Sequence, residues 1–340
     1  MIVIGGIPLR KFPEPGGKKM KKYLMLLALF IGVSLITGPV APTLALAKFP
    51  EKEITLVCPW PPGGSSDLIT RTIAKVGAKY FPKPIIVINK AGANGVVATT
   101  ESVRTPADGY TLIQGATGLF TSTIIVQKTV GYKQEDFDFL MGMTNEPMVL
   151  TVHPSSPYKS LDEMIKNAKE KDLVIRYSNS GLGGFPQVCV AYLFQLAGVK
   201  SQPIPFKGGG PAMTAILGAH VDMGVAHPGE VIPHVKAGKL RPLAISSVQR
   251  FSGLPEVPTM KEKGYNVDMG VKKYLFVPKG LPDDVRRFLV GNLTQTIRDN
   301  EFKNAMIQMD ILWEPLTGKE VVDHLNSQYP ILKKLLEEVE

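Results

Sequence analysis

The chain has 340 residues, of which 44% are hydrophobic and 20% charged, a composition typical of a globular protein with a sizeable core. Its formal net charge is +9, but residues 1–47 carry six of the basic residues against one acid, which leaves only +4 for the remainder. This balance, with no basic stripe carrying interleaved aromatics, excludes a nucleic-acid-binding footprint, and the length predicts two domains at about 100–200 residues each.

The N-terminal segment, residues 1–47, has the order of a secretory signal peptide. A basic stretch at 18–22 precedes the uncharged apolar run 23–36, and Ala45-Leu46-Ala47 offers a small-x-small cleavage site. The run is shorter than the ~20 residues that a helix needs to span a bilayer. We therefore predict cleavage after Ala47 and a periplasmic or extracytoplasmic protein, with Met20 as an alternative start. An uncleaved membrane anchor is the competing interpretation.

The first part of the mature chain alternates short β-rich runs with helical patterns. Apolar, β-branched runs predict strands at 54–59, 84–89 and 110–114, and apolar residues at helical spacing predict helices at 66–80 and 95–103. The order β-α-β-α-β is typical of a mostly parallel sheet flanked by helices.

The alternation continues after residue 147. Further strands are predicted at 148–152, 174–177, 202–206, 223–226, 243–246 and 274–277, and helices at 160–169, 187–197, 211–217 and 229–237. Ser160 with Glu163 forms a capping-box pattern for the first of these helices, and residues 283–340 are predominantly helical. No Pro/Gly/Ser linker divides the body, so two α/β units joined by crossing strands are expected.

Three segments share one design, in which a strand leads through a glycine-rich turn into a helix. They are residues 61–67, 178–186 and 206–211. A helix start leaves backbone N–H groups without intrahelical partners and carries partial positive charge, and glycines let a ligand approach the backbone closely. Pro186 and Pro211 suit the first helical position. Because these loops follow strands at the ligand-binding edge of α/β sheets, they predict an anion site, to which Ser65, Ser66, Ser178 and Ser180 add hydroxyl donors. Simple helix capping is the competing interpretation for any one loop.

Three side chains near these loops allow two interpretations each. Asp67 would repel an anion, so it either caps the helix and orients loop amides or accepts from a ligand hydroxyl. Lys207 is a candidate counter-charge or an ordinary exposed lysine. Trp60 is a lid over the ligand or half-buried packing.

Enzyme, metal and cofactor signatures are missing from the sequence. It contains no G-x-S-x-G, G-x-x-x-x-G-K-[ST] or G-x-G-x-x-G pattern. His220, His227 and His234 are seven apart, but a predicted strand interrupts them, so no metal site and no cofactor are expected. The two cysteines, Cys58 and Cys189, could pair in an exported protein; two separate buried thiols are the favoured interpretation.

Several motifs in a fixed order give the mature chain its resemblance to a known family. They are FPEKEITLVCPWPPGGSSD (49–67), INKAGANG (88–95), PADGYTL (106–112), YSNSGLGG (177–184), PFKGGGPA (205–212), HVKAGKLRPLA (234–244) and LPEVPTMKEKGY (254–265). With these motifs, residues 48–340 resemble the Bug-type extracytoplasmic receptors, the solute-binding subunits of tripartite tricarboxylate transporters.

The resemblance implies an α/β, two-domain, periplasmic-binding-protein-like fold of type II (Venus flytrap), with mixed, mostly parallel sheets and two interdomain crossovers. Domain 1 would hold residues 48–150 and 272–340, and domain 2 residues 151–271. The ligand carboxylate would be held by the first loop and by the serine/glycine loop of domain 2. Carried over by position, the ligand-binding residues are Pro62, Gly63, Gly64, Ser65, Ser66 and Asp67, then Ser178, Ser180, Gly181, Gly183 and Gly184, with Thr117 as a further candidate.

Two departures from the family pattern bear on the ligand. Family members usually carry Ser or Thr, followed shortly by His, after the last glycine of the second loop, whereas this chain reads Gly184-Phe185-Pro186-Gln187. They also often have a tryptophan before the strand near 274, where this chain has Gly270-Val271-Lys272-Lys273. Phe185 therefore predicts a more apolar pocket and a ligand with an apolar body, such as a branched or aromatic carboxylate.

The function that follows is capture of a small carboxylate, without catalysis, and delivery to the permease subunits of a tripartite transporter. A monomer that binds no nucleic acid is expected. Two alternatives remain at this stage: an exported hydrolase that uses Ser65, Ser66 or Ser178, and a sensor that presents its ligand to a signalling partner.

Overall fold

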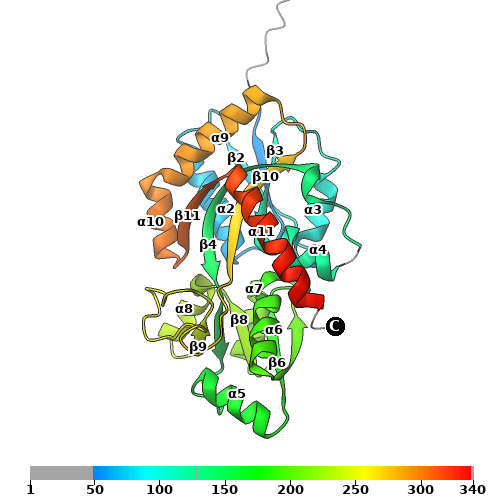
Figure 1. Cartoon of the computed structure of the whole chain (residues 1–340). Coiled ribbons are helices and arrows are strands. Elements are labelled where there is room, and N and C mark those ends of the chain that lie inside the picture. Colours follow the sequence, from blue (N-terminus) through cyan, green and yellow to red (C-terminus); the bar gives the residue numbers. More distant parts are fainter. Residues whose placement is uncertain (1–48, 128, 338–340) are drawn as a thin grey trace, which may run out of the picture. The chain divides into compact units, whose positions relative to one another are not determined.

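The computed structural model describes residues 49–127 and 129–337, so the predicted signal peptide lies outside the described residues (Figure 1). The first of two mixed sheets has the strand order β11-β4-β10-β3-β1-β2. Strands β1, β2 and β3 pair in parallel, while β10 runs antiparallel to β3 and β4, and β11 antiparallel to β4. The bounds are β1 (Ile54–Cys58), β2 (Ile85–Asn89), β3 (Thr111–Ala116), β4 (Phe137–Pro147), β10 (Gly270–Pro278) and β11 (Leu312–Thr317).

The second sheet has the order β7-β6-β8-β5-β9. Only β6, β7 and β8 pair in parallel, and β5 runs antiparallel to both of its neighbours. The expectation of mostly parallel sheets therefore holds for one part of each sheet and is wrong for the rest. The bounds are β5 (Val149–Val152), β6 (Val174–Asn179), β7 (Lys200–Pro205), β8 (Met223–Ala226) and β9 (Arg241–Ile245).

Helices follow most of the parallel strands. Those attached to the first sheet are α2 (Ser65–Gly77), α3 (Val96–Ser102), α4 (Ser122–Val126), α9 (Asp283–Arg298), α10 (Asn300–Gln308) and α11 (Gly318–Glu337), with short 3₁₀ turns η1 (Ala93–Gly95), η2 (Thr117–Phe120) and η3 (Gln134–Asp136). Those attached to the second are α5 (Leu161–Glu170), α6 (Phe185–Ala197), α7 (Gly209–Leu217) and α8 (Pro228–Lys236). No helix among the described residues is both long and apolar enough to cross a membrane.

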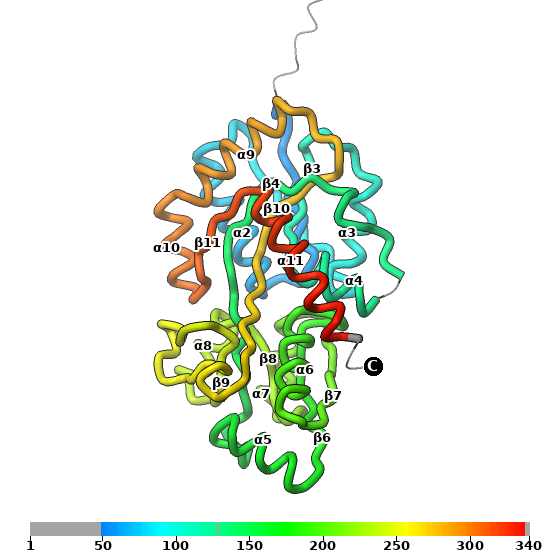
Figure 2. The backbone as a smooth tube through the Cα atoms, viewed as in Figure 1, coloured from blue at the N-terminus to red at the C-terminus, as the bar shows by residue number. Residues whose placement is uncertain are grey.

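The chain passes between the two sheets twice, as the tube in Figure 2 shows. It leaves the first sheet where β4 ends at Pro147 and β5 begins at Val149. It returns between the end of β9 and the start of β10, where Gly270 pairs with Pro147. The two crossing segments therefore lie side by side. The exact domain boundaries, 150/151 and 271/272, stay predictions.

Separate apolar clusters hold the two sheets together with their helices. In the first, Ile69, Ile73 and Val76 of α2 are fully buried against Leu289 and Leu293 of α9. Their i, i+4, i+7 spacing places them on one face of the helix, and full burial of each stabilises the fold by about 1.5–3 kcal/mol. A second cluster includes Tyr177 of β6 and the side chains of α6 that pack behind it.

Local signals explain several element ends and correct others. The Ser160 hydroxyl accepts the Glu163 N–H at the start of α5, as predicted, but the Glu163 carboxylate accepts from the Lys159 N–H, so the reciprocal capping-box bond is not formed. Pro186 and Pro211 stand at the second and third positions of α6 and α7 rather than the first, because these helices begin at Phe185 and Gly209.

Candidate functional site

The start of α2 is the best-defined part of the candidate site. Gly63, at a φ of +88°, turns the chain so that Gly64 can precede the helix, and Gly64 provides no side-chain cap. The first backbone N–H groups of α2 therefore have no intrahelical partner. Ser65 and Ser66, the first two residues of the helix, are buried beside them. This end of α2 can receive an anion.

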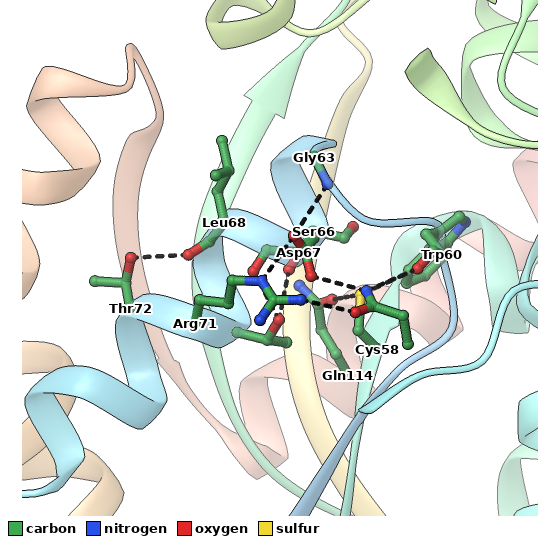
Figure 3. A network of polar contacts seen from close by, with 11 residues as sticks. Cys58, Trp60, Gly63, Ser66, Asp67, Leu68, Arg71, Thr72 and Gln114 are labelled. Carbon is green, nitrogen blue, oxygen red and sulfur yellow. Dashed lines mark hydrogen bonds and ion pairs between the residues drawn. The ribbon is translucent and has the colours of Figure 1, made fainter. Parts of the chain in front are cut away.

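The Asp67 carboxylate is bonded to this turn and to its neighbours. Its carboxylate accepts hydrogen bonds from the Gly63 N–H (3.0 Å), Asn89 Nδ2 (2.8 Å) and Arg71 Nε (2.9 Å), as Figure 3 shows for Gly63 and Arg71. Burial alone would raise the pKa of Asp67, but the hydrogen bonds from Arg71, Gly63 and Asn89 outweigh it and hold the pKa below its usual value. Asp67 thus holds the Gly63 amide of the loop, and its possible contact with a ligand hydroxyl stays a prediction.

A buried cation, Lys273 of β10, lies against this helix start. Its side chain is 5% exposed, and Nζ donates to Ser66 Oγ at 3.1 Å. Glu146 of β4 places Oε1 3.9 Å from Nζ, and its Oε2 accepts from Ser65 Oγ. Nζ also lies 5.4 Å from the centre of a Trp60 ring, within reach of a cation–π interaction. The two serines of the first loop are therefore tied to a lysine–glutamate pair.

The second sheet contributes the facing wall. Ser180 follows β6, and His227 follows β8 and precedes α8. Burial, with help from the charge of Lys273, lowers the pKa of His227 to about 4, so the imidazole is neutral at pH 7. Its Nδ1 is buried and has no hydrogen-bond partner among the described residues. A buried, neutral imidazole can donate to or accept from a ligand.

The side chain of Glu230 lies against the third glycine-rich loop. A Cβ on Gly209 would lie only 2.2 Å from Glu230 Oε1, so Gly209 lets that carboxylate approach the start of α7. The same carboxylate oxygen lies close to Gly64 of the first loop. Glu230 therefore places negative charge at the start of α7 and also close to the residue that precedes α2.

These residues enclose a small central cavity between the first and second sheets. Its volume is about 50 Å³, room for a few water molecules. It is lined from the first loop and β10 by Trp60, Pro61, Pro62, Gly64, Ser65, Ser66 and Lys273, and from the second sheet's loops by Ser180, Gly209, Gly210, His227 and Glu230.

A smaller adjoining hollow of about 30 Å³ shares four lining residues with the cavity: Trp60, Ser180, His227 and Lys273. The rest of its wall is mostly apolar and includes Ala116, Leu119, Phe185, Pro186 and Val271. Phe185 is 3% exposed. The two spaces together offer a polar, charged end and an apolar end.

The other predicted residues of the second loop lie outside the cavity. Ser178 is buried within β6, against Gly224. Gly183 touches α4, where its carbonyl accepts from Ser122 Oγ (2.7 Å) and Thr123 Oγ1 (3.2 Å), and Gly181 and Gly184 lie against Asn94. These glycines join the second sheet's loop to the first sheet's helices rather than line the cavity.

Thr117 and Lys207 also lie apart from the central cavity. The Thr117 hydroxyl accepts from the Lys272 N–H at 2.9 Å, a contact that positions β10. Lys207 is exposed. Cys58 and Cys189 are both buried free thiols, as the favoured interpretation predicted. Among the described residues, no three His, Cys, Asp or Glu side chains gather to hold a metal ion.

Comparison with known proteins identifies the family of the chain. Residues 69–334 match the family described as the tripartite tricarboxylate transporter family receptor. The chain belongs to this receptor family. Protein BugT of Bordetella pertussis is 33% identical over 238 residues, which cover 69% of this chain and 73% of BugT.

Solved structures agree with the receptor's fold. The periplasmic binding protein BugD, 27% identical, covers 86% of this chain and 98% of its own with a TM-score of 0.79. An R. palustris protein solved with adipate, 24% identical, covers 86% and 98% with a TM-score of 0.80. The two-domain, periplasmic-binding-protein-like α/β fold is confirmed, as is the resemblance to Bug-type receptors.

The sequence did not single out three charged or titratable residues of the receptor's site. The sequence analysis named Lys273 only as part of a departure from the family pattern and His227 only as a possible metal ligand. It did not name Glu146. A signal for Lys273 existed, since a lysine within a β-rich run is unusual. Which way that lysine faces depends on strand register, which the local sequence does not determine.

Proposed function

We propose that this receptor captures a small carboxylate outside the cytoplasm and delivers it to the membrane permease of a tripartite transporter. The observation that carries the proposal is the central cavity. It combines the open N-terminus of α2, the Ser66 hydroxyl and a buried lysine, groups that each favour a carboxylate. The family described by the match is one of transporter receptors, which supports transport over catalysis.

The adjoining hollow supports a ligand with an apolar body. Phe185, Leu119 and Val271 line it, and it opens on the same side chains that line the charged end. Glu230 also lines the cavity, so a ligand with several carboxylates would bring like charges together there. The chemistry of these walls matches branched or aromatic monocarboxylates better than it matches citrate.

The direct test is calorimetry on the processed, exported protein with isobutyrate, benzoate, succinate, adipate and citrate. We expect binding of at least one carboxylate, with isobutyrate or benzoate tighter than citrate. Absence of binding to all of them at millimolar concentration would overturn the proposal.

A matched pair of variants on α2 tests the geometry. Ser66→Ala should weaken carboxylate binding by up to about tenfold, because a hydroxyl at the cavity is lost. Thr72→Ala, which removes an exposed hydroxyl bonded to the Leu68 carbonyl of the same helix, should leave affinity unchanged. Equal effects of the two substitutions would contradict the placement of the ligand at the start of α2.

One observation bears on the alternative of a hydrolase. The hydrogen bond between Ser66 and Lys273 is the contact that a Ser–Lys nucleophile would need. Here, however, Lys273 forms an ion pair with Glu146, and an ammonium donates to the serine instead of accepting its proton. Turnover of ester substrates that disappears in Ser66→Ala would favour the hydrolase. Transport is separated from sensing by solute uptake in cells with and without the receptor.

A further inference from the structure

The pairing of β4 with β10 determines which residues reach the cavity. Val271 lies opposite Glu146, and Lys273 lies opposite Thr144 in the antiparallel register. Side chains two residues apart on a strand share a face, so Glu146 and Lys273 are diagonal neighbours on one face. The register shifts directly after Lys273, and such irregularities commonly re-aim side chains near binding sites.

Lys273 has more hydrogen-bonding capacity than the described protein atoms use. An ammonium has three N–H donors. Within residues 49–127 and 129–337, its one hydrogen-bond partner is Ser66 Oγ, and Glu146 Oε1 at 3.9 Å is too far for a hydrogen bond. Lys273 also lines both the central cavity and the adjoining hollow. Its unused donors are therefore available at the ligand space.

Glu146 explains how a lysine is kept in this place. Its side chain is 1% exposed, and it lines neither the cavity nor the hollow. A buried charge without a partner is costly, so each member of the pair supports the ionised form of the other. Glu146 Oε1 accepts no hydrogen bond from the described residues. The pair is thus electrostatic and leaves the protons of Lys273 free for another acceptor.

We propose that Lys273 is the counter-charge of the bound carboxylate and that Glu146 is the positioning residue that holds it there. The proposal rests on the proposed function and names the residue that makes the site selective for an ionised acid over its neutral amide. Lys207, the candidate counter-charge of the sequence analysis, is exposed and lines neither the central cavity nor the adjoining hollow.

Calorimetry with matched acids and amides tests the proposal: benzoate against benzamide, isobutyrate against isobutyramide, and adipate against adipamide. In Lys273→Met, affinity for the acid should fall about 10- to 100-fold, as expected for loss of a hydrogen bond to a charged group. Affinity for the amide should change little. In Lys207→Met, affinity for the acid should stay within about twofold of the wild type, since exposed charges interact weakly.

Glu146→Gln gives an independent readout if Lys273→Met does not fold. It removes the partner that holds Lys273 in place and supports its ionised form, so the acid should bind less tightly and the ligand-free protein should become less stable, while affinity for the amide should change little. A purely structural pair would instead lower stability in both variants and leave the affinity for the acid unchanged. The double variant Lys273→Met/Glu146→Gln should fold, because no unpaired buried charge remains, and should bind acid weakly.

The outcomes separate the two proposals. Tight binding of an acid by both the wild type and Lys273→Met overturns the role of Lys273, and unchanged acid binding by Glu146→Gln overturns the role of Glu146; either result leaves the proposed function standing. Loss of acid binding in Lys207→Met alone would assign the counter-charge to that lysine. If the wild type binds none of the acids, the proposed function fails and the role of Lys273 fails with it.

Discussion

At the scale of single residues, His227 makes the stability of the folded protein depend on pH. Its pKa in the folded protein is about 4, because the ring is buried and lies near Lys273, whereas a histidine in an unfolded chain titrates near 6.5. As the pH falls below neutrality, the unfolded chain takes up a proton that the folded protein refuses. The contribution of His227 to stability is therefore fully present above about pH 6.5 and is lost as the pH falls toward 4.

The expected size of this effect is about 2 kcal/mol of unfolding free energy between pH 7 and pH 5. Urea denaturation of the wild type and of His227→Gln at both pH values measures it as the difference between the two proteins, which removes contributions from other groups. A pH dependence that is the same in both proteins would show that His227 is not held neutral.

Residue identity alone predicted only part of the site. The open start of α2, with Gly64, Ser65 and Ser66 at the cavity, follows from local rules of helix geometry, as does the hydrogen bond from the Gly63 N–H to Asp67. Ser178 and Ser180 could not be told apart, because the sequence does not show that β6 ends at Asn179, which leaves Ser178 inside the strand and Ser180 in the loop that lines the cavity. Lys207 and Lys273 are equally basic in the sequence, and only strand pairing places one of them inside.

At the scale of elements, the sequence analysis did not predict the two strands β4 and β11, which lack the usual alternation or contain proline. β4 (Phe137–Pro147) is buried almost throughout, so its sequence FDFLMGMTNEP shows no alternation and contains Gly142, Asn145 and Pro147. β11 contains Pro315, which its place at the sheet edge and an irregular register tolerate. The elements that were predicted are the short apolar strands and amphipathic helices whose local patterns agree with their burial.

The loop before α6 allows a prediction with an internal control. Gly183 has a φ of +70°, and a Cβ there would lie 3.0 Å from Val126 Cβ and 3.2 Å from Thr123 Cα of α4. Gly238 has nearly the same φ, +68°, but open space around it. Both substitutions to alanine should lower stability by roughly 1–2 kcal/mol through backbone strain.

Only Gly183→Ala should also weaken carboxylate binding, because it pushes the second loop away from Ser122 and Thr123. Thermal denaturation and calorimetry on both variants measure the two effects. Equal affinities in Gly183→Ala and Gly238→Ala would show that contact with α4 does not help to form the site.

At the scale of the whole molecule, the two passages between the sheets were expected from the family resemblance. The motifs place the crossings near residues 150 and 272, and the structure has the first between Pro147 and Val149 and the second between Ile245 and Gly270. The segments that connect the two sheets contain no local sequence signal for where one domain ends and the next begins. The cavity, formed by loops more than 100 residues apart, is likewise a product of this arrangement.

Because both sheets line the cavity, ligand binding should be registered by both at once. A ligand changes the balance between conformations only through contacts that differ between them, so closure of a two-sided site needs contacts on each side.

Hydrogen exchange with and without benzoate, or with whichever panel acid binds most tightly, tests this. We expect slower exchange at the start of α2, residues 63–67, together with residues 180–185 and 227–230 of the second sheet's loops. Exchange in α5, whose residues line neither the cavity nor the hollow, should not change. Protection confined to the loops of one sheet would mean that the solute binds to that half alone, and closure around it would then have no driving force.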